Sequence, residues 1–233
     1  MLSKKTLANV MNKYFDSYRN YSNRVKTEYM DVCISNGNTK IGKTMNVSIG
    51  YTGCIESGAF IVCGGSCYSV RDMVRHPNSV IPARAKNQAL AEYDRDNFFE
   101  QIKTKMSRRR KNFYFRWHVA GEIIDYDYFC CMVEIAKEFP NFKIWTYTKR
   151  YDIVNKYCAE NGGRAAIPEN FNIMFSAWPG LNMANPYNFP RFEFIPKTEN
   201  NLPHKFTCPG NCDYCKKHNT GCIAGVSTNC REH

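Results

Sequence analysis

Apolar and polar positions recur along the chain with two different periods, and these periods predict where helices and strands lie. Residues 4–19 place Leu7, Val10, Met11 and Tyr14 at the spacing of one helical face, so we expect an amphipathic helix there. Short runs of β-branched and aromatic residues predict strands instead. The predicted strands are residues 45–51, 113–119, 142–148 and 171–178, with a further candidate at 191–195.

Helical patterns separate these strands. The predicted helices are residues 82–106, about 125–139, and 151–158. Pro82 suits the first turn of one long helix, and Asp125 or Asp127 can cap the next helix, which Pro140 ends. Gly162, in the run Asn-Gly-Gly, is typical of the end of the third helix.

Strands that alternate with helices predict a parallel sheet with right-handed crossovers. Four or five strands are too few for a closed eight-stranded barrel. We therefore expect an α/β fold, an open or partial (β/α) barrel with parallel strands, over residues 1–200. Residues 201–233 are rich in Cys and have little periodicity. They predict a separate metal-organised C-terminal segment outside the sheet.

Charge and cysteine content narrow the classes of function. The net charge is +11, and the densest basic run spans residues 103–111, which predicts either an anionic partner such as nucleic acid or a solvated helix end. No apolar run approaches the roughly 20 residues that span a bilayer, and no signal peptide is apparent. We expect a cytoplasmic protein without a membrane partner. Nothing in the sequence indicates an oligomeric state.

In a reducing compartment the twelve cysteines favour metal binding over disulfides. Cys208, Cys212, Cys215 and Cys222 follow the pattern Cys-x3-Cys-x2-Cys-x6-Cys, which can wrap around one centre without long-range folding. Four thiolates suit either zinc or a [4Fe–4S] cluster. The ligands are packed more tightly than in most zinc fingers, so we predict iron and sulfur here, with zinc as the alternative.

A second group is formed by Cys54, Cys63 and Cys67, which follow the first predicted strand. Active sites of parallel α/β folds lie at the carboxyl ends of the strands. Three thiolates would leave a fourth position on the metal open, as a catalytic centre requires. The alternative interpretation is that these are ordinary buried cysteines.

Polar residues also end the next two predicted strands. Arg116 and His118 are two positions apart and therefore share one face of their strand. A positive group and an imidazole inside a sheet are costly unless they are paired, and Glu122 is a plausible partner or a ligand for an amine. The following strand ends near Lys149. We predict Arg116, His118 and Lys149 as catalytic residues.

The order of these parts resembles the radical S-adenosylmethionine superfamily over roughly residues 46–180. The Cys-rich loop that ends in Cys67-Tyr68 is similar to the cluster loop of these enzymes, Gly121-Glu122 to their Gly-Glu motif, and Thr148 to the Thr of their third-strand motif. The resemblance implies a [4Fe–4S] cluster on Cys54, Cys63 and Cys67 whose open iron binds S-adenosylmethionine. It implies a cofactor-binding role for Gly121, Glu122 and Thr148.

More narrowly, the whole chain resembles the phage proteins called gene product 88. The shared features are an Arg-x-His-x-x-Gly-Glu segment from Arg116 to Glu122, a Tyr-Thr-Lys segment that ends at Lys149, and a Cys-rich C-terminus. This resemblance implies a phage protein that acts in the cytoplasm of the host cell.

The spacing of the cysteines leaves three arrangements open. The loop after the first strand reads Cys-x8-Cys-x3-Cys, whereas the superfamily spacing, Cys-x3-Cys-x2-Cys, occurs at Cys208, Cys212 and Cys215. Either the tail holds an auxiliary cluster, or the reactive cluster is at the C-terminus, or both groups serve one site. We predict an iron–sulfur protein with one or two clusters, in which Cys54, Cys63 and Cys67 carry the chemistry. The alternative is a basic nucleic-acid-binding protein stabilised by zinc or by a structural cluster.

Overall fold

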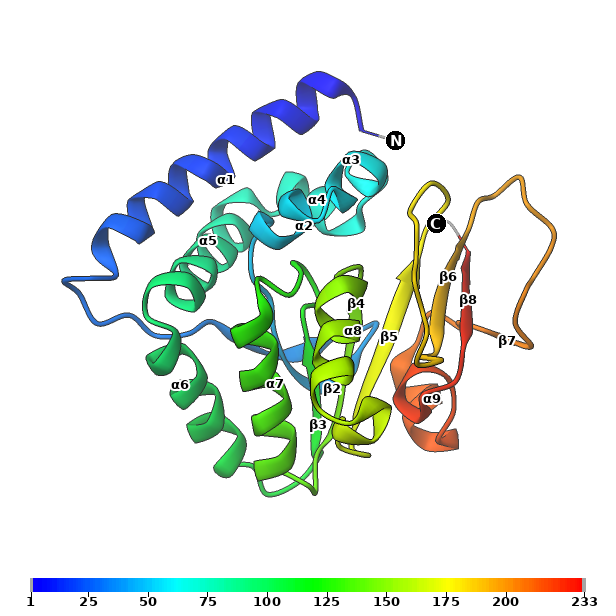
Figure 1. The fold of residues 1–233 in the computed structure, drawn as a ribbon. Helices are drawn as coiled ribbons and strands as arrows, with labels where there is room; N and C mark the ends of the chain where they lie inside the picture. Colours follow the sequence, from blue (N-terminus) through cyan, green and yellow to red (C-terminus); the bar gives the residue numbers. More distant parts are fainter. Residues whose placement is uncertain (1, 232–233) are drawn as a thin grey trace.

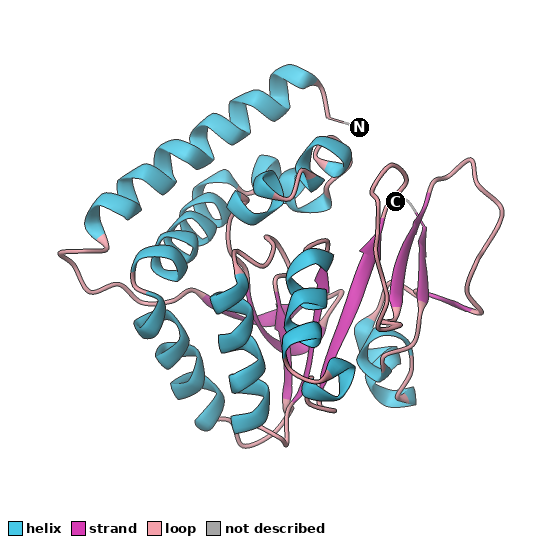
Figure 2. Ribbon diagram, viewed as in Figure 1, coloured by secondary structure: helices cyan, strands magenta, loops and turns pink. Residues whose placement is uncertain are grey.

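The alternation of side chains along strand β4 (Lys143–Thr148) shows how the molecule is layered. Ile144 packs into the large core beneath the helices, whereas Trp145 and Tyr147 point to the opposite face, where they meet Cys215 and Ile223. The chain therefore covers both faces of one sheet. The computed structural model describes residues 2–231, and Figures 1 and 2 show the arrangement.

The sheet has eight strands in the order β1-β2-β3-β4-β5-β6-β8-β7. Only the β1–β2 pair is antiparallel. The remaining strands are β1 (Ile34–Asn38), β2 (Gly42–Val47), β3 (Tyr114–Trp117), β5 (Phe171–Ala177), β6 (Arg191–Ile195), β7 (Phe206–Thr207) and β8 (Thr228–Arg231). Because β1 and β7 are edges, the sheet does not close. The α/β class and the parallel strands are confirmed, and a barrel is not.

Helices connect the strands and cover mainly one face. They are α1 (Lys4–Arg24), α2 (Thr52–Glu56), α3 (Ala59–Cys63), α4 (Tyr68–Arg75), α5 (Pro77–Tyr93), α6 (Arg95–Ser107), α7 (Tyr126–Glu138), α8 (Tyr151–Glu160) and α9 (Cys212–His218), with short 3₁₀ helices η1 (Gly163–Ala166) and η2 (Gly221–Ala224). Helices α5 to α8 contribute to the large core with the sheet. Helix α1 packs on α5 and α4 in a second core above the strand ends (Figure 1).

All five predicted strands exist, as does the predicted cap at Asp125, whose side chain accepts a hydrogen bond from the Tyr128 N–H. The single helix predicted from Pro82 to Met106 is wrong. Helix α5 begins at Pro77 and ends at Tyr93, so Pro82 lies inside it, and α6 starts after Asp94. Either proline satisfies the rule for a first turn, and the helix begins at the earlier one.

The expectation that the C-terminal segment lies outside the sheet is also wrong. The tail, defined as residues 201–231, supplies β7 and β8, and β8 pairs in parallel with β6 from Thr228 to Arg231. Helix α9 lies on the opposite side of β5 from α8 (Figure 1). The tail thus covers the face of the sheet that helices α5 to α8 leave open.

Helix α9, in the middle of the tail, is fastened to the turn between β1 and β2. The Cys212 N–H donates to the Lys40 carbonyl at 2.9 Å, and the Lys216 Nζ donates to the Ile41 carbonyl at 2.8 Å. A side chain at Gly42 would collide with Asp213 of α9. The tail therefore spans the open face from β8 to the opposite part of the sheet. No helix among residues 2–231 is long and apolar enough to cross a membrane.

We predict that Asn229→Ala loosens the tail. Asn229 is fully buried, and its amide donates to the carbonyls of His204 and Phe206 and accepts from the His204 N–H. Leaving these groups unpaired should lower the free energy of unfolding by about 1–3 kcal/mol. Urea titration measures this loss, and Asn200→Ala, at an exposed position, is the control. Equal stability of the two variants would contradict this placement of the tail.

Candidate functional site

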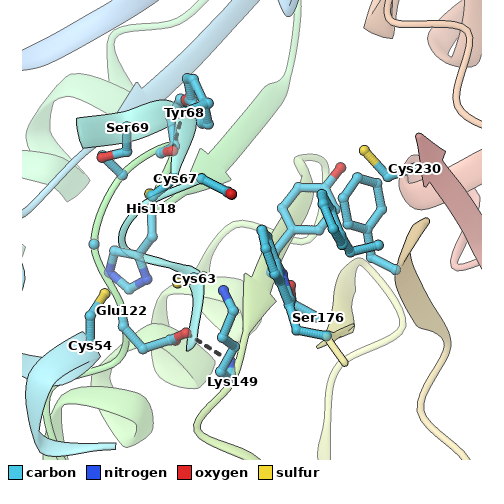
Figure 3. Close-up of a pocket in the computed structure, with 18 of the residues that line it drawn as sticks. Cys54, Cys63, Cys67, Tyr68, Ser69, His118, Glu122, Lys149, Ser176 and Cys230 are labelled. Carbon is cyan, nitrogen blue, oxygen red and sulfur yellow. Dashed lines mark hydrogen bonds between the residues drawn. The ribbon is translucent and has the colours of Figure 1, made fainter. Parts of the chain in front are cut away.

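A pocket of about 270 Å³ lies at the carboxyl-terminal edge of the parallel strands. This volume is close to the lower end of the roughly 300–1,000 Å³ that small-molecule sites occupy. Residues that follow β2, β3, β4 and β5 line it, and the tail closes its other side (Figure 3). Polar residues at successive strand ends thus meet in one place, as the parallel sheet requires.

The loop after β2 brings three thiols to this pocket, here called the loop cysteines: Cys54 in α2, Cys63 at the end of α3 and Cys67 before α4. All three are free. A hydrogen bond from Cys63 lowers the pKa of Cys67 to about 6, and the same bond raises the pKa of Cys63. Burial raises the pKa of Cys54. The hydrogen bond thus favours the thiolate form of Cys67, which is the form that binds metal.

A buried hydrogen-bond network holds this loop in place. The Arg84 guanidinium, from α5, donates to the Ser69 carbonyl at 2.7 Å and to the Asp72 carboxylate at 2.6 Å. The Tyr51 hydroxyl shares a hydrogen bond with the Ser69 hydroxyl, and the Tyr51 N–H donates to the Tyr14 hydroxyl of α1. Because both terminal nitrogens of this buried guanidinium are partnered, it fixes the segments on either side of the loop cysteines.

Glu122 follows β3 and is buried, and both of its carboxylate oxygens accept hydrogen bonds. Oε1 accepts from the Thr148 hydroxyl at 2.6 Å and from the Ile123 N–H at 2.9 Å, and Oε2 accepts from the Lys149 N–H at 2.7 Å. Burial raises the pKa of Glu122, and these hydrogen bonds oppose the increase. Thr148 lies outside the pocket lining and positions the carboxylate that faces it.

Lys149 places its ammonium group between Glu122 and the loop cysteines. Burial lowers the pKa of Lys149, but the charges of Cys63, Glu122 and the other loop cysteines outweigh it, so the net shift is upward. The amino group points toward Cys63 in Figure 3. This end of the pocket therefore offers a fixed carboxylate and a fixed positive charge beside three thiols.

The segment after β3 has an unusual backbone. His118 has φ +49 and Gly121 has φ +96. A Cβ at Gly121 would lie 2.8 Å from the Gly50 carbonyl oxygen, so only glycine lets this segment approach the loop after β2. His118 is buried, and its Nε2 bonds the Tyr128 hydroxyl, but its Nδ1 has no hydrogen-bond partner within residues 2–231. Burial and the charge of Arg116 lower the pKa of His118 to about 3, so it is neutral.

Five further thiols form the tail cysteines: Cys208, Cys212, Cys215, Cys222 and Cys230. Burial raises the pKa of each of the last four, and the neighbouring Cys208 raises it further, which shows that the five lie together. Cys208, Cys212 and Cys230 line the pocket. Cys215 packs against Trp145 instead, and Cys222 faces the Thr228 hydroxyl at 3.8 Å.

Most of the predicted site residues meet in this pocket. Its lining includes the loop cysteines, Arg116, His118, Gly121, Glu122, Lys149, Cys208 and Cys212, but not Thr148, Cys215 or Cys222. The predicted tail quartet therefore does not face the pocket as a set. The basic run of residues 103–111 also lies elsewhere, at and beyond the end of α6 at Ser107.

The lining also contains residues that the sequence interpretation did not select as site residues, among them Tyr68, Trp178 and Cys230. Trp178 directly follows β5, so the strand-end rule that selected Lys149 could have selected it as well. Tyr68 donates to the Val119 carbonyl at 2.8 Å and so joins the loop to the segment after β3. Cys230 lies in β8, whose polar sequence has no strand pattern, so nothing signalled that it faces the pocket.

The side chains around the pocket can be compared with what a single metal ion and a [4Fe–4S] cluster each require. Among residues 2–231, no three His, Cys, Asp or Glu side chains converge closely enough to hold a single metal ion. A [4Fe–4S] cluster makes a different demand, because each thiolate binds its own iron and the sulfurs are spread around the cluster. Three free thiols beside one ammonium group supply the donor type that a cluster needs, but Cys63 and Cys67 share a hydrogen bond and must separate before each can bind its own iron.

Comparison with known proteins supports the narrower of the two resemblances. Residues 34–179 match the family model of gene product 88. The chain belongs to the gene product 88 family. The match covers β1 to the end of β5, and therefore includes the loop cysteines, Arg116, Glu122 and Lys149. The tail cysteines lie outside the part of this gene product 88 protein that matches. No curated protein and no solved structure matches the chain.

We predict that Thr148→Val destabilises the protein and Thr148→Ser does not. The valine removes the hydroxyl that donates to buried Glu122, which leaves a carboxylate oxygen less well paired. The expected loss in unfolding free energy is about 1–3 kcal/mol. Urea unfolding at neutral pH measures it. If the serine variant loses as much as the valine variant, packing of the Thr148 methyl group is responsible and the proposed support of Glu122 is wrong.

We also predict that His118 makes the protein sensitive to acid. Its pKa is lowered from 6.5 to about 3 by burial, so the unfolded chain binds a proton in this range that the folded chain excludes. Stability should therefore fall as the pH decreases from 6.5 toward 3 and should not depend on this group above pH 6.5. Asparagine tolerates the positive φ of this position. In His118→Asn the pH-dependent part of the stability that comes from His118 should therefore vanish. Parallel pH slopes for both proteins in urea unfolding would contradict the assignment.

Proposed function

We propose that this protein is an iron–sulfur enzyme of the radical S-adenosylmethionine type. The observation that supports this best is the meeting of the loop cysteines with Glu122 and Lys149 at the carboxyl edge of a parallel sheet. When bound, a [4Fe–4S] cluster with S-adenosylmethionine supplies reductive chemistry that ends in hydrogen abstraction from a substrate. The chain's own residues hold, orient and shield these groups.

In this proposal the loop cysteines hold the cluster by three thiolates. Glu122 is the acceptor for the methionyl amine, and the Thr148 hydroxyl and the Lys149 N–H fix its orientation before the cofactor binds. The Lys149 ammonium group offsets the negative charge of the thiolates. Gly121 allows the close approach between the two segments that form this end of the pocket.

The tail cysteines are proposed as ligands of a second [4Fe–4S] cluster, with zinc as the alternative metal. Cys208, Cys212 and Cys230 line the same pocket as the loop cysteines, which supports the interpretation that both groups serve one site. We place the reaction in the cytoplasm of a phage-infected host cell, because free thiols and iron–sulfur clusters persist in a reducing compartment.

A nucleic-acid partner is a second proposal. It rests on the net charge of +11 and on the basic residues that continue beyond the end of α6. Binding to an oligonucleotide that weakens steeply with added salt would support it.

We predict that protein purified without oxygen is brown and contains iron and sulfide. Cys67→Ala should lose part of the iron and all reductive cleavage of S-adenosylmethionine. Cys212→Ala should lose a different part of the iron, and Cys33→Ala, at a half-buried position outside the pocket, should lose none. Metal and sulfide analysis with product chromatography measures these outcomes. A colourless protein that holds stoichiometric zinc would refute the proposal.

A further inference from the structure

The pocket is strongly cationic. Its lining contains five basic residues and one acidic residue: Lys40, Arg71, Arg116, Lys149 and Arg231, against Glu122. Both oxygens of Glu122 already accept hydrogen bonds from Thr148, Ile123 and Lys149. Even with the Cys67 thiolate counted, the basic residues of the lining outnumber its negative groups. A cavity with this balance favours an anionic ligand.

Arg116 is the basic residue that most clearly lacks a partner. Its guanidinium lies over the Tyr147 ring, 4.6 Å from the centroid, and its Nε is buried without a hydrogen bond. Within residues 2–231 no carboxylate and no carbonyl pairs with it. Arg84 offers a comparison inside the same chain, because that buried guanidinium bonds Asp72, Ser69 and Tyr51. A guanidinium held in a pocket without such partners is prepared to bind a carboxylate or a phosphate.

Arg116 and Lys149 mark different ends of the pocket. The groups that influence Lys149 most are Cys63, Glu122 and the other loop cysteines. Those that influence Arg116 are Tyr147, Tyr68 and two of the tail cysteines. The Lys149 end is thus the end that the proposed function assigns to the cluster and its cofactor. The Arg116 end lies beside the tail cysteines, so a second ligand bound there adjoins the metal that these cysteines are proposed to hold.

Aromatic rings line the pocket from Arg116 to Lys149, whose Nζ lies 5.6 Å from the centroid of the Trp178 ring. Trp178 and Phe194 are stacked with their centroids 3.9 Å apart and their planes 5° from parallel, and both line the pocket. Phe192 packs against Tyr147 at 4.6 Å, beneath the Arg116 guanidinium. Aromatic walls beside a free guanidinium suit a planar ring that carries a phosphate, because the ring stacks and the phosphate accepts paired hydrogen bonds.

We propose that the pocket binds a nucleotide, with Arg116 as its phosphate-binding residue and its base extending along the aromatic rings toward the Trp178–Phe194 pair. A role for this nucleotide as the substrate of a radical reaction rests on the proposed function. Its binding does not depend on that chemistry. The nucleotide is either free or part of a single strand. Both sources share the phosphate and the base that the pocket recognises.

The test is calorimetry on the full-length protein, prepared without oxygen. The probes are adenosine, guanosine, cytidine and uridine 5′-monophosphates, the matching nucleosides, inorganic phosphate, and a short single-stranded oligonucleotide. At least one monophosphate should bind more tightly than both its nucleoside and inorganic phosphate. Tighter binding of the oligonucleotide than of any monophosphate would identify a strand as the source, and the reverse would identify a free nucleotide.

Arg116→Gln should weaken binding of the preferred monophosphate roughly tenfold to hundredfold and leave nucleoside binding unchanged. Arg116→Lys keeps the charge but not the paired donors, so it should weaken binding less. Arg110→Gln, at an exposed position outside the pocket, removes the same charge and should have no effect. Quenching of tryptophan emission, with Trp178 as the only tryptophan in the lining, should accompany binding.

Two results would overturn the proposal. One is that no monophosphate binds better than its nucleoside. The other is that Arg116→Gln and Arg116→Lys leave nucleotide affinity unchanged but shift the visible spectrum of the metal bound by the tail cysteines, which would make Arg116 a counter-ion of that metal. Nucleotide binding by a protein that contains no iron would sustain this inference and refute the proposed function, so the two failures can be told apart.

Discussion

Parallel pairing between β8 and β6 fixes where the tail cysteines lie, and the composition of the pocket depends on it. Thr228 to Arg231 run beside Phe192 to Ile195, and β7 adds to the outer side of β8. Between β7 and β8 the chain crosses the face of the sheet opposite helices α5 to α8, where Lys216 of α9 fastens it to the β1–β2 turn. The tail is therefore held by β6 on one side and by the β1–β2 turn on the other, and Cys208 and Cys212 face the pocket that the loop cysteines line.

The balance of charge in the pocket follows from this arrangement. Lys149 lies within the field of the loop cysteines, and Arg116 within that of the tail cysteines. Cations withdrawn from water are costly unless negative groups accompany them. Both oxygens of Glu122 already accept hydrogen bonds, so Glu122 cannot balance the charges of both Lys149 and Arg116. The structure therefore places two cations where thiolates, or ligands bound beside them, complete the charge balance.

Much of the sheet could be predicted because buried parallel strands are apolar runs bounded by turns. The strand β1, Ile-Ser-Asn-Gly-Asn, has no such run and forms because it pairs with β2 across a tight turn. Strand β8 is polar and forms because it pairs with β6, and the two-residue strand β7 pairs in turn with β8. Pattern alone shows neither of these pairings, because each is decided by contacts between distant segments.

The candidate site was predictable to the same extent. The rule that polar residues at the ends of parallel strands converge selected Arg116, Glu122 and Lys149, which do meet. The rule does not show direction, so it could not separate Lys149, which faces the pocket, from Thr148, which supports Glu122 from behind. Cysteine spacing grouped Cys208, Cys212, Cys215 and Cys222, but it could not show that Cys215 turns toward Trp145 while Cys230 turns toward the pocket.

The most direct test of this account is diffraction from crystals of protein prepared without oxygen, recorded on both sides of the iron and zinc absorption edges. The account predicts anomalous iron density bonded to Cys54, Cys63 and Cys67, inside the pocket that Cys208 and Cys212 also line. Zinc bound to these cysteines, a disulfide between any two of them, or the absence of anomalous density next to them would contradict it.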